Sequence, residues 1–151
     1  MKTIPATLDS LDGLRDVDSA CLLIVEDERP IKGASGLFDW RLCGEVSRAL
    51  QSGFFAGATS ERLLIPSQGR VPVERVFVMG LGPAAGVSLV AFEHSVRMAR
   101  DVLAKAGAKS VAFALPKVKP DFNDLLGVVD RVFHGEPVKC QAFANTTGRV
   151  V

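Results

Sequence analysis

The chain has 151 residues, of which 48% are hydrophobic and 23% are charged, and its formal net charge is +1. This length suits one domain with its own core, so we expect residues 1–151 to form a single domain. The near-neutral balance gives no bulk attraction to nucleic acid or to an anionic membrane. No apolar run approaches the roughly 18 residues of a membrane-spanning helix, and the first residues lack the apolar core of a signal peptide.

Three cysteines, Cys21, Cys43 and Cys140, lie far apart in the sequence, each beside apolar residues. An odd number at wide spacing does not suit a disulfide framework. We interpret them as buried thiols of a protein that works in a reducing compartment, which predicts a cytoplasmic location.

The first half of the chain predicts two strands and one helix. Residues 1–8 suit an edge strand, because Pro5 lacks the N–H that a central strand needs, and residues 9–13 suit a turn. The apolar run 21–25 predicts a strand buried on both faces, and the acidic segment 26–36 predicts a loop. A single helix ending at Gly53 is indicated by an apolar stripe of Phe38, Leu42, Val46 and Ala49.

The second half predicts two paired strands and then alternating helices and strands. Residues 62–65 and 75–79 suit a hairpin-like pair joined by a polar segment. Ser88 is a favourable N-cap for a helix that closes at Gly107, with the apolar stripe Leu89, Phe92, Val96, Ala99 and Leu103. Strands follow at 110–115 and 138–144. Between them, Asp121 caps a helix whose inner face holds Phe122, Leu125, Leu126, Val129 and Val132.

This order of elements predicts the fold class. Helices that alternate with buried strands are typical of an α/β protein in which helices cover both faces of one sheet. We therefore predict a three-layer α/β/α sandwich over a mixed sheet.

A glycine turn follows the strand at 75–79, with Gly80, Gly82 and Gly86 before the helix capped by Ser88. A strand, a glycine turn and a helix N-terminus together can bind an anion through backbone N–H groups. The spacing is one residue longer than a dinucleotide fingerprint, and Pro83 removes an N–H from the turn. Two interpretations therefore stay open: a tight structural turn, or an anion or nucleotide site.

If a small ligand binds, we expect it between the loops 26–36, 80–88 and 117–121. The residues that this hypothesis assigns to binding are Gly33, Gly36, Gly80, Gly82, Gly86, Ser88 and Lys117. The acids at 26–28 are interpreted as a solvated loop. Lys117 is either a phosphate contact or an ordinary surface lysine.

We predict no metal site, no cofactor and no catalytic residue. The two histidines, His94 and His134, have no second ligand at metal-binding spacing. We place His94 on the solvent face of its helix and His134 at a helix C-terminus, where a cation favours the dipole. Trp40, the sole tryptophan, is expected to be half-buried, either packing in the core or anchoring a partner.

Four segments together resemble the N-terminal domain of the cytosol (leucyl) aminopeptidases, a family of metallopeptidases. They are residues 54–57 (FFAG), 63–66 (LLIP), 75–82 (RVFVMGLG) and 104–116 (AKAGAKSVAFALP). The resemblance covers residues 18–116 in order and spacing. It implies a macro-domain-like fold, which agrees with the predicted sandwich. The family's metal ligands and catalytic arginine belong to a larger C-terminal domain, so the resemblance transfers no catalytic residue.

The resemblance supports three functional hypotheses. The first is a stand-alone, non-catalytic interaction or assembly module, because this domain lies at subunit contacts of a hexamer in the family. Its partner would be a second copy or an aminopeptidase catalytic subunit. The second is a macro-type site for ADP-ribose or a related nucleotide, in which Asp18 begins the strand that carries an adenine-binding aspartate in macro domains. The third and weakest is DNA binding.

Overall fold

The computed structural model describes residues 1–144, which form six strands and five α-helices around one sheet. The strand order is β1-β6-β5-β2-β4-β3, and every neighbouring pair is parallel except the antiparallel pair β3 and β4. The predicted mixed sheet is confirmed. The strands are β1 (Lys2–Ile4), β2 (Ser19–Ile24), β3 (Arg62–Pro66), β4 (Arg75–Gly80), β5 (Ser110–Ala114) and β6 (Lys139–Phe143).

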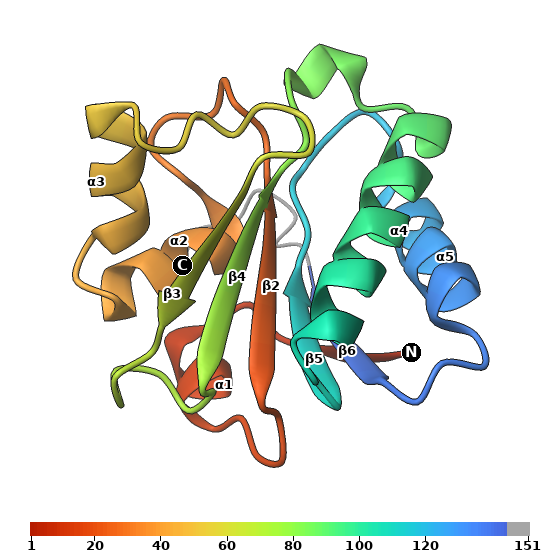
Figure 1. The fold of residues 1–151 in the computed structure, drawn as a ribbon, viewed down its shortest axis with the longest axis horizontal. Helices are drawn as coiled ribbons and strands as arrows, with labels where there is room; N and C mark the ends of the chain where they lie inside the picture. The colour runs from red at the N-terminus through yellow and green to blue at the C-terminus, as the bar shows by residue number, and fades with distance from the viewer. Residues whose placement is uncertain (145–151) are drawn as a thin grey trace.

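Helices cover both faces of the sheet, as the three-layer prediction requires. Figure 1 shows α4 and α5 together on one side and α2 and α3 on the other. A short 3-10 turn, η1 (Ala84–Gly86), leads into α4. The helices are α1 (Leu8–Asp12), α2 (Gly33–Arg41), α3 (Glu45–Ser52), α4 (Leu89–Lys105) and α5 (Phe122–Phe133).

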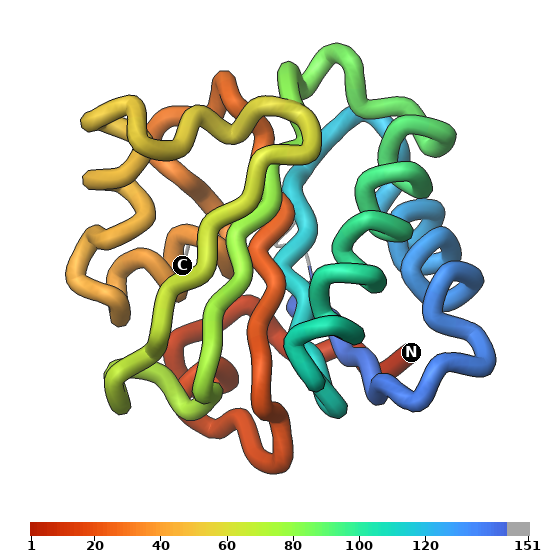
Figure 2. Tube along the Cα trace, in the orientation of Figure 1, coloured from red at the N-terminus to blue at the C-terminus, as the bar shows by residue number. Residues whose placement is uncertain are grey.

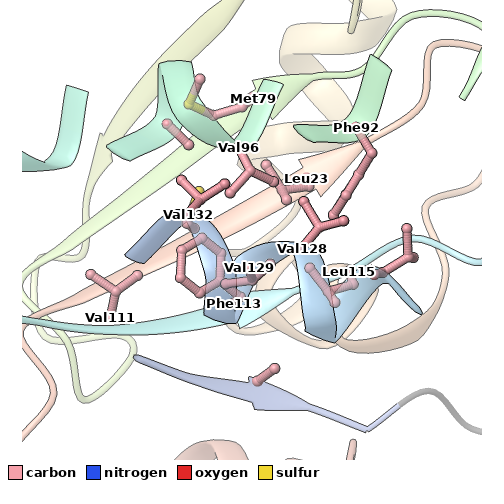
Figure 3. Packing of buried hydrophobic residues seen from close by; sticks show 14 of the residues in the cluster. Leu23, Met79, Phe92, Val96, Val111, Phe113, Leu115, Val128, Val129 and Val132 are labelled. Atoms are coloured by element: carbon pink, nitrogen blue, oxygen red, sulfur yellow. The ribbon is translucent and has the colours of Figure 1, made fainter. Parts of the chain in front are cut away.

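Two apolar clusters fill the space between the layers, because all six residues of β2 are buried and alternate between its two faces. Cys21 and Leu23 join the cluster under α4 and α5, and Leu22 joins the one under α2 and α3. Figure 3 shows the first cluster, where Phe92 and Val96 of α4 and Val128 of α5 lie over Leu23 and Phe113. The continuous apolar run of β2 is therefore that of a strand buried on both faces.

The starts of the two long helices agree with the prediction to different degrees. Ser88 caps α4 as predicted, since its side chain accepts a hydrogen bond from Ala91 N–H at 3.1 Å. Asp121 is the N-cap residue of α5, but its side chain makes no capping hydrogen bond. On the inner face of α5, Phe122 and Leu126 are only partly buried, whereas Val128 is buried.

Two predictions for the first half of the chain are wrong. Residues 9–13, predicted as a turn, lie mostly in helix α1, which starts because Thr7 Oγ1 accepts a hydrogen bond from Ser10 N–H at 3.1 Å. The single helix predicted to end at Gly53 is two helices. Its break lies at Cys43 and Gly44, with φ of 58° and 79°, and α2 also begins at Gly33, inside the predicted loop 26–36.

The break between α2 and α3 is stabilised by a buried carboxylate. Asp39 Oδ1 accepts hydrogen bonds from Val46 N–H at 2.8 Å and Ser47 N–H at 3.2 Å, which are free donors at the start of α3. Asp39 therefore caps α3 from the preceding helix. Because Phe38, Leu42 and Val46 are all fully buried, the apolar stripe runs across the break and conceals it in the sequence.

Two predictions about exposure are wrong. Trp40 is 71% exposed rather than half-buried. Cys43 is exposed, because it lies in the left-handed turn between the helices, so only Cys21 is fully buried as predicted. Cys140 is partly buried, and burial raises the pKa of its thiol to about 12.

The chain between α3 and β3 crosses closely over the end of β4. Gly82 N–H donates to Gly57 O at 3.0 Å, and Gly80 N–H donates to Glu61 O at 2.8 Å. A Cβ at Gly80 would overlap the carbonyl of Ala58, and one at Gly82, which has φ of 78°, would overlap Thr59 Oγ1. We call this contact of residues 57–61 with residues 80–82 the backbone clasp. It requires glycine at both positions of the turn.

Asp18, just before the opposite end of β2, hydrogen-bonds to the start of the neighbouring strand β5. Its carboxylate accepts hydrogen bonds from Lys109 N–H at 2.8 Å, Ser110 N–H at 3.0 Å and Ser19 Oγ at 2.7 Å, and Arg75 lies 3.9 Å away. Burial raises the pKa of Asp18, but these hydrogen bonds and the Arg75 charge outweigh it, so the net pKa is lowered. The carboxylate links the connections that lead into β2 and β5.

The clasp predicts that Gly80→Ala destabilises the protein by about 3 kcal/mol or more, because the neighbouring backbone must move to admit the methyl group. Urea unfolding would measure this loss. Gly127→Ala is the matched control. Gly127 is exposed within α5 with no atom within 4 Å of the added carbon, so we expect a gain of about 0.5–1 kcal/mol. Equal effects of the two substitutions would contradict the clasp.

The lowered pKa of Asp18 predicts an acid-dependent contribution to stability. A carboxylate with a depressed folded-state pKa stabilises fully above its unfolded pKa of about 3.9, and this stabilisation is lost as the pH falls through the folded value. Thermal unfolding should therefore show wild type well above Asp18→Asn at pH 7, with the two converging towards pH 2. A gap that is constant with pH would show that the charge of Asp18 does not contribute.

Asp12→Asn is the control for that measurement. Asp12 pairs with Arg41 at 2.6 Å on the surface, so about 0.5 M salt should screen its contribution. The contribution of Asp18 should survive that salt, because its partners include two backbone N–H groups in direct contact.

Candidate functional site

Three connections meet at one edge of the sheet, where the parallel strands β2, β4 and β5 end. In open α/β sheets, ligands bind at this carboxyl edge. The cavity there is small, with a volume of about 280 Å³. Its lining is mostly charged and consists of Val25, Asp27, Glu28, Arg29, Lys32, Ala84 and Lys117.

The structure brings only part of the predicted ligand set to this cavity. Lys117 lines it, whereas Gly33 and Gly36 lie in the first turns of α2. Gly80 and Gly82 lie under the backbone clasp, and Gly86 and Ser88 lie in the approach to α4. Asp18 is remote from the cavity, at the amino end of β2. Ligand binding by the seven predicted residues stays a prediction.

The N–H groups of the glycine turn already have partners within the protein. Besides the two donors in the clasp, Leu81 N–H donates to Ile24 O at 2.8 Å, and Gly86 N–H donates to Pro83 O at 3.0 Å. Pro83 has no N–H to offer. An anion would therefore have to displace existing hydrogen bonds at most positions of this turn.

A carboxylate of the protein occupies another donor at the same place. Asp27 Oδ1 accepts a hydrogen bond from Ala84 N–H at 3.0 Å, joining the loop after β2 to the start of η1. The segment predicted as a solvated acidic loop thus contributes an internal bond. Asp27 fills the position that a phosphate oxygen would take at a free N–H group, and its charge disfavours an anionic ligand.

A larger cavity lies at the opposite edge of the sheet, where sequence reasoning assigned no site. It has a volume of about 1190 Å³ and lies against the amino ends of β2, β5 and β6. Arg100, which lines this cavity, pairs with Asp101 and Glu136, and the Asp18 carboxylate accepts a hydrogen bond from Lys109 N–H. Three of its charged side chains, Asp18, Arg100 and Glu136, therefore already have partners within the protein. Its apolar lining includes Val71, Val73 and Val138.

Several large apolar side chains are exposed on α2, after α3 and on β3. Trp40 of α2 is 71% exposed, Phe54 after α3 is 76% exposed, and Leu64 of β3 is 53% exposed. Of these three residues, only Trp40 was expected to be partly exposed. Phe54 and Leu64 each stand beside another apolar residue, Phe55 and Leu63, and only the fold decides which of the two is buried.

Neither histidine meets a metal-binding group in residues 1–144. His94 is exposed on α4, as predicted, and His134 is exposed at the C-cap of α5. That part of the chain contains no group of three His, Cys, Asp or Glu residues able to hold a metal ion. Within the same residues, no helix is long and apolar enough to cross a membrane.

The chain matches the family model described as "Cytosol aminopeptidase family, N-terminal domain" over residues 22–135. A probable cytosol aminopeptidase of Ralstonia pickettii is 33% identical over 98 residues, which is 64% of this chain and 20% of that protein. The chain spans about a fifth of the length of the curated relatives it matches. The resemblance found in the sequence is confirmed.

Solved structures agree on the fold. A mutant of tomato leucine aminopeptidase matches 88% of this chain and 30% of its own, with a TM-score of 0.56 and 18% identity. The macrodomain of Mycobacterium tuberculosis DarG matches 97% of this chain and 99% of its own, with a TM-score of 0.71 and 14% identity. The macro-domain-like architecture is confirmed by these likenesses, and the family match shows that this chain belongs to the cytosol aminopeptidase family, as its N-terminal domain.

Proposed function

We propose that this domain is a non-catalytic interaction module, which associates with a second copy of itself or with the catalytic part of an aminopeptidase. The observation that carries the proposal is the exposure of Trp40 and Phe54, at 71% and 76%, in the layer formed by α2 and α3. Aromatic side chains exposed to this extent are characteristic anchors of protein interfaces.

The size of the relatives supports a protein partner. The matched region is about a fifth of each curated relative, so four fifths of those polypeptides lie outside it. A domain of this family therefore occurs beside a much larger body of protein, and its surface has to include a face that fits that body. Exposed aromatic residues on one layer suit such a face.

The carboxyl edge of the sheet supports a small-ligand function less well. Its cavity of about 280 Å³ is below the size of most ligand pockets. The turn donors are bonded internally, and Asp27 occupies the N–H of Ala84. We therefore rank macro-type nucleotide binding below interaction with a protein. DNA binding ranks lower still, because a net charge of +1 offers few phosphate contacts.

Trp40 provides a direct test, because it is the sole tryptophan and the chain has no tyrosine. In dilute solution its fluorescence should be that of a solvated indole. Raising the protein to about 0.5 mM, or adding a full-length cytosol aminopeptidase, should shift the emission to shorter wavelength as the indole leaves water. Sedimentation velocity on the same samples would show whether a larger species forms.

Phe54→Glu should weaken this association by roughly tenfold or more, since it places a charge at an anchor position. Val90→Glu is the matched control, because Val90 is 83% exposed on α4, away from the α2 and α3 layer. If neither self-association nor aminopeptidase binding changes the emission or the sedimentation, the interaction function is refuted.

Calorimetry with ADP-ribose separates the two leading hypotheses. We expect no binding heat at about 1 mM ligand with the wild-type protein, because the turn donors are occupied. Asp27→Ala would free Ala84 N–H and remove a negative charge, and it should leave binding weak because the clasp remains. A micromolar dissociation constant for the wild type would instead establish the nucleotide site.

A further inference from the structure

The backbone of β3 presents unpaired hydrogen-bonding groups along the outer edge of the sheet. β3 pairs with β4 on one side only, in the register Leu63 with Val78 and Ile65 with Val76. Figure 2 shows its trace as the outermost strand beside β4. An open strand edge is a template for pairing with another strand.

The hydrogen-bond pattern identifies which residues point outward. Ser67 N–H donates to Glu74 O at 3.1 Å at one end of the pair, and Gly80 N–H donates to Glu61 O at 2.8 Å at the other. Inward and outward residues alternate along an antiparallel strand. Because residues 61 and 67 bond inward, so do 63 and 65, and residues 62, 64 and 66 direct their backbone groups outward.

This edge offers two donors, the N–H groups of Arg62 and Leu64, and neither has a hydrogen-bond partner among the described residues. Pro66 contributes a carbonyl but no N–H. The proline limits how far a partner strand can pair, which restricts the edge to one short match rather than open-ended aggregation. The side chains of the three outward residues are all exposed.

We propose that β3 pairs antiparallel with β3 of a second copy, about a twofold axis through Leu64, to form one continuous sheet. This inference rests on the proposed interaction function and adds to it a second surface, the edge of β3, with a second copy of the chain as the partner. In this register each Leu64 N–H meets the Leu64 carbonyl of the other copy, and each Arg62 N–H meets a Pro66 carbonyl. Every free donor is then satisfied, and the missing N–H of Pro66 leaves only a carbonyl unpaired.

Side chains select this register over its neighbour. With Leu64 on the axis, the two leucines, each 53% exposed in the monomer, lie opposite one another, and Leu63 lies opposite Ile65 on the other face. Arg62 faces Pro66 and is well separated from Arg62 of the second copy, so no like charges oppose. A register in which Arg62 faces Leu64 would satisfy the same donors but would leave both leucines beside a charge.

Charge substitution at Leu64 tests the twofold axis directly. Sedimentation equilibrium should show a weak wild-type dimer, populated between roughly 0.1 and 1 mM, as expected for a small interface. Leu64→Lys and Leu64→Glu should each weaken it about tenfold, because like charges then face across the axis. An equimolar mixture of the two variants should recover dimer to at least the wild-type level, since lysine then faces glutamate.

Val90→Lys is the matched control, because it adds a charge at an 83% exposed apolar position far from β3. Circular dichroism and urea unfolding of both Leu64 variants should match wild type, since that side chain lies outside the core. Amide exchange adds a second readout. The amides of Arg62 and Leu64 should become protected as concentration rises, whereas those of Leu63 and Ile65 should be protected throughout.

The outcomes separate this inference from the function on which it rests. A dimer that is insensitive to both Leu64 variants, or variants that fail to recover on mixing, would overturn pairing through β3 and leave interaction through the α2 and α3 layer intact. A protein that stays monomeric at 1 mM would overturn the pairing as well. Its emission response to a full-length aminopeptidase would then decide the interaction function separately.

Discussion

The contact on which this end of the molecule depends is the passage of residues 57–61 across the end of β4. Three hydrogen bonds join the segment to Gly80 and Gly82, and neither glycine has room for a side chain. Glu61 adds a further bond, since its side chain accepts from Ala56 N–H at 2.9 Å. The clasp ties the chain that leaves α3 to the end of β4, the strand between β2 and β3, and it sets where β3 begins beside β4.

The clasp also explains why two separate sequence motifs occur together. The segment ending at Gly57 and the segment containing Gly80 and Gly82 are far apart in the sequence, but their backbones are in contact. Gly57 has φ of 82°, and a Cβ there would lie 3.2 Å from Glu26 Cα, so the loop after β2 is part of the same contact. Glycine is required on both sides of one backbone contact, which is a packing constraint rather than a phosphate cradle. The same bonds leave few donors for a ligand at this edge.

Sequence reasoning reached the layers and most strands because buried strands and long helices leave a strong apolar signal. It missed the break between α2 and α3 because Phe38, Leu42 and Val46 keep helical spacing across Cys43 and Gly44. The cap that fixes the break, Asp39, reads as an ordinary charged residue on an outer face. The spacing of apolar residues does not indicate that the Asp39 side chain accepts a hydrogen bond from a backbone N–H seven residues later.

The candidate site shows the same limit more strongly. The sequence placed Gly80, Gly82 and Lys117 at one edge of the sheet. The order of the predicted strands is enough for that placement, because these residues follow the ends of two of them. It could not predict that Asp27 would occupy the N–H of Ala84, because that bond joins residues 57 positions apart. Nor could it choose between Leu63 and Leu64 for burial, since two adjacent leucines satisfy either register of the strand.

The antiparallel direction of β3 connects the fold to the proposed interaction. Every other strand pair in the sheet is parallel and needs a long crossover, whereas β3 turns directly into β4 through the short connection 67–74. A strand added in this way lies at the edge, with neither a following helix nor another strand to cover its outer side. Pro66 shortens the exposed ladder, and Arg62 keeps it polar, as natural edge strands require. Leu64 departs from that pattern of protection, because an exposed leucine between those two residues favours pairing rather than preventing it.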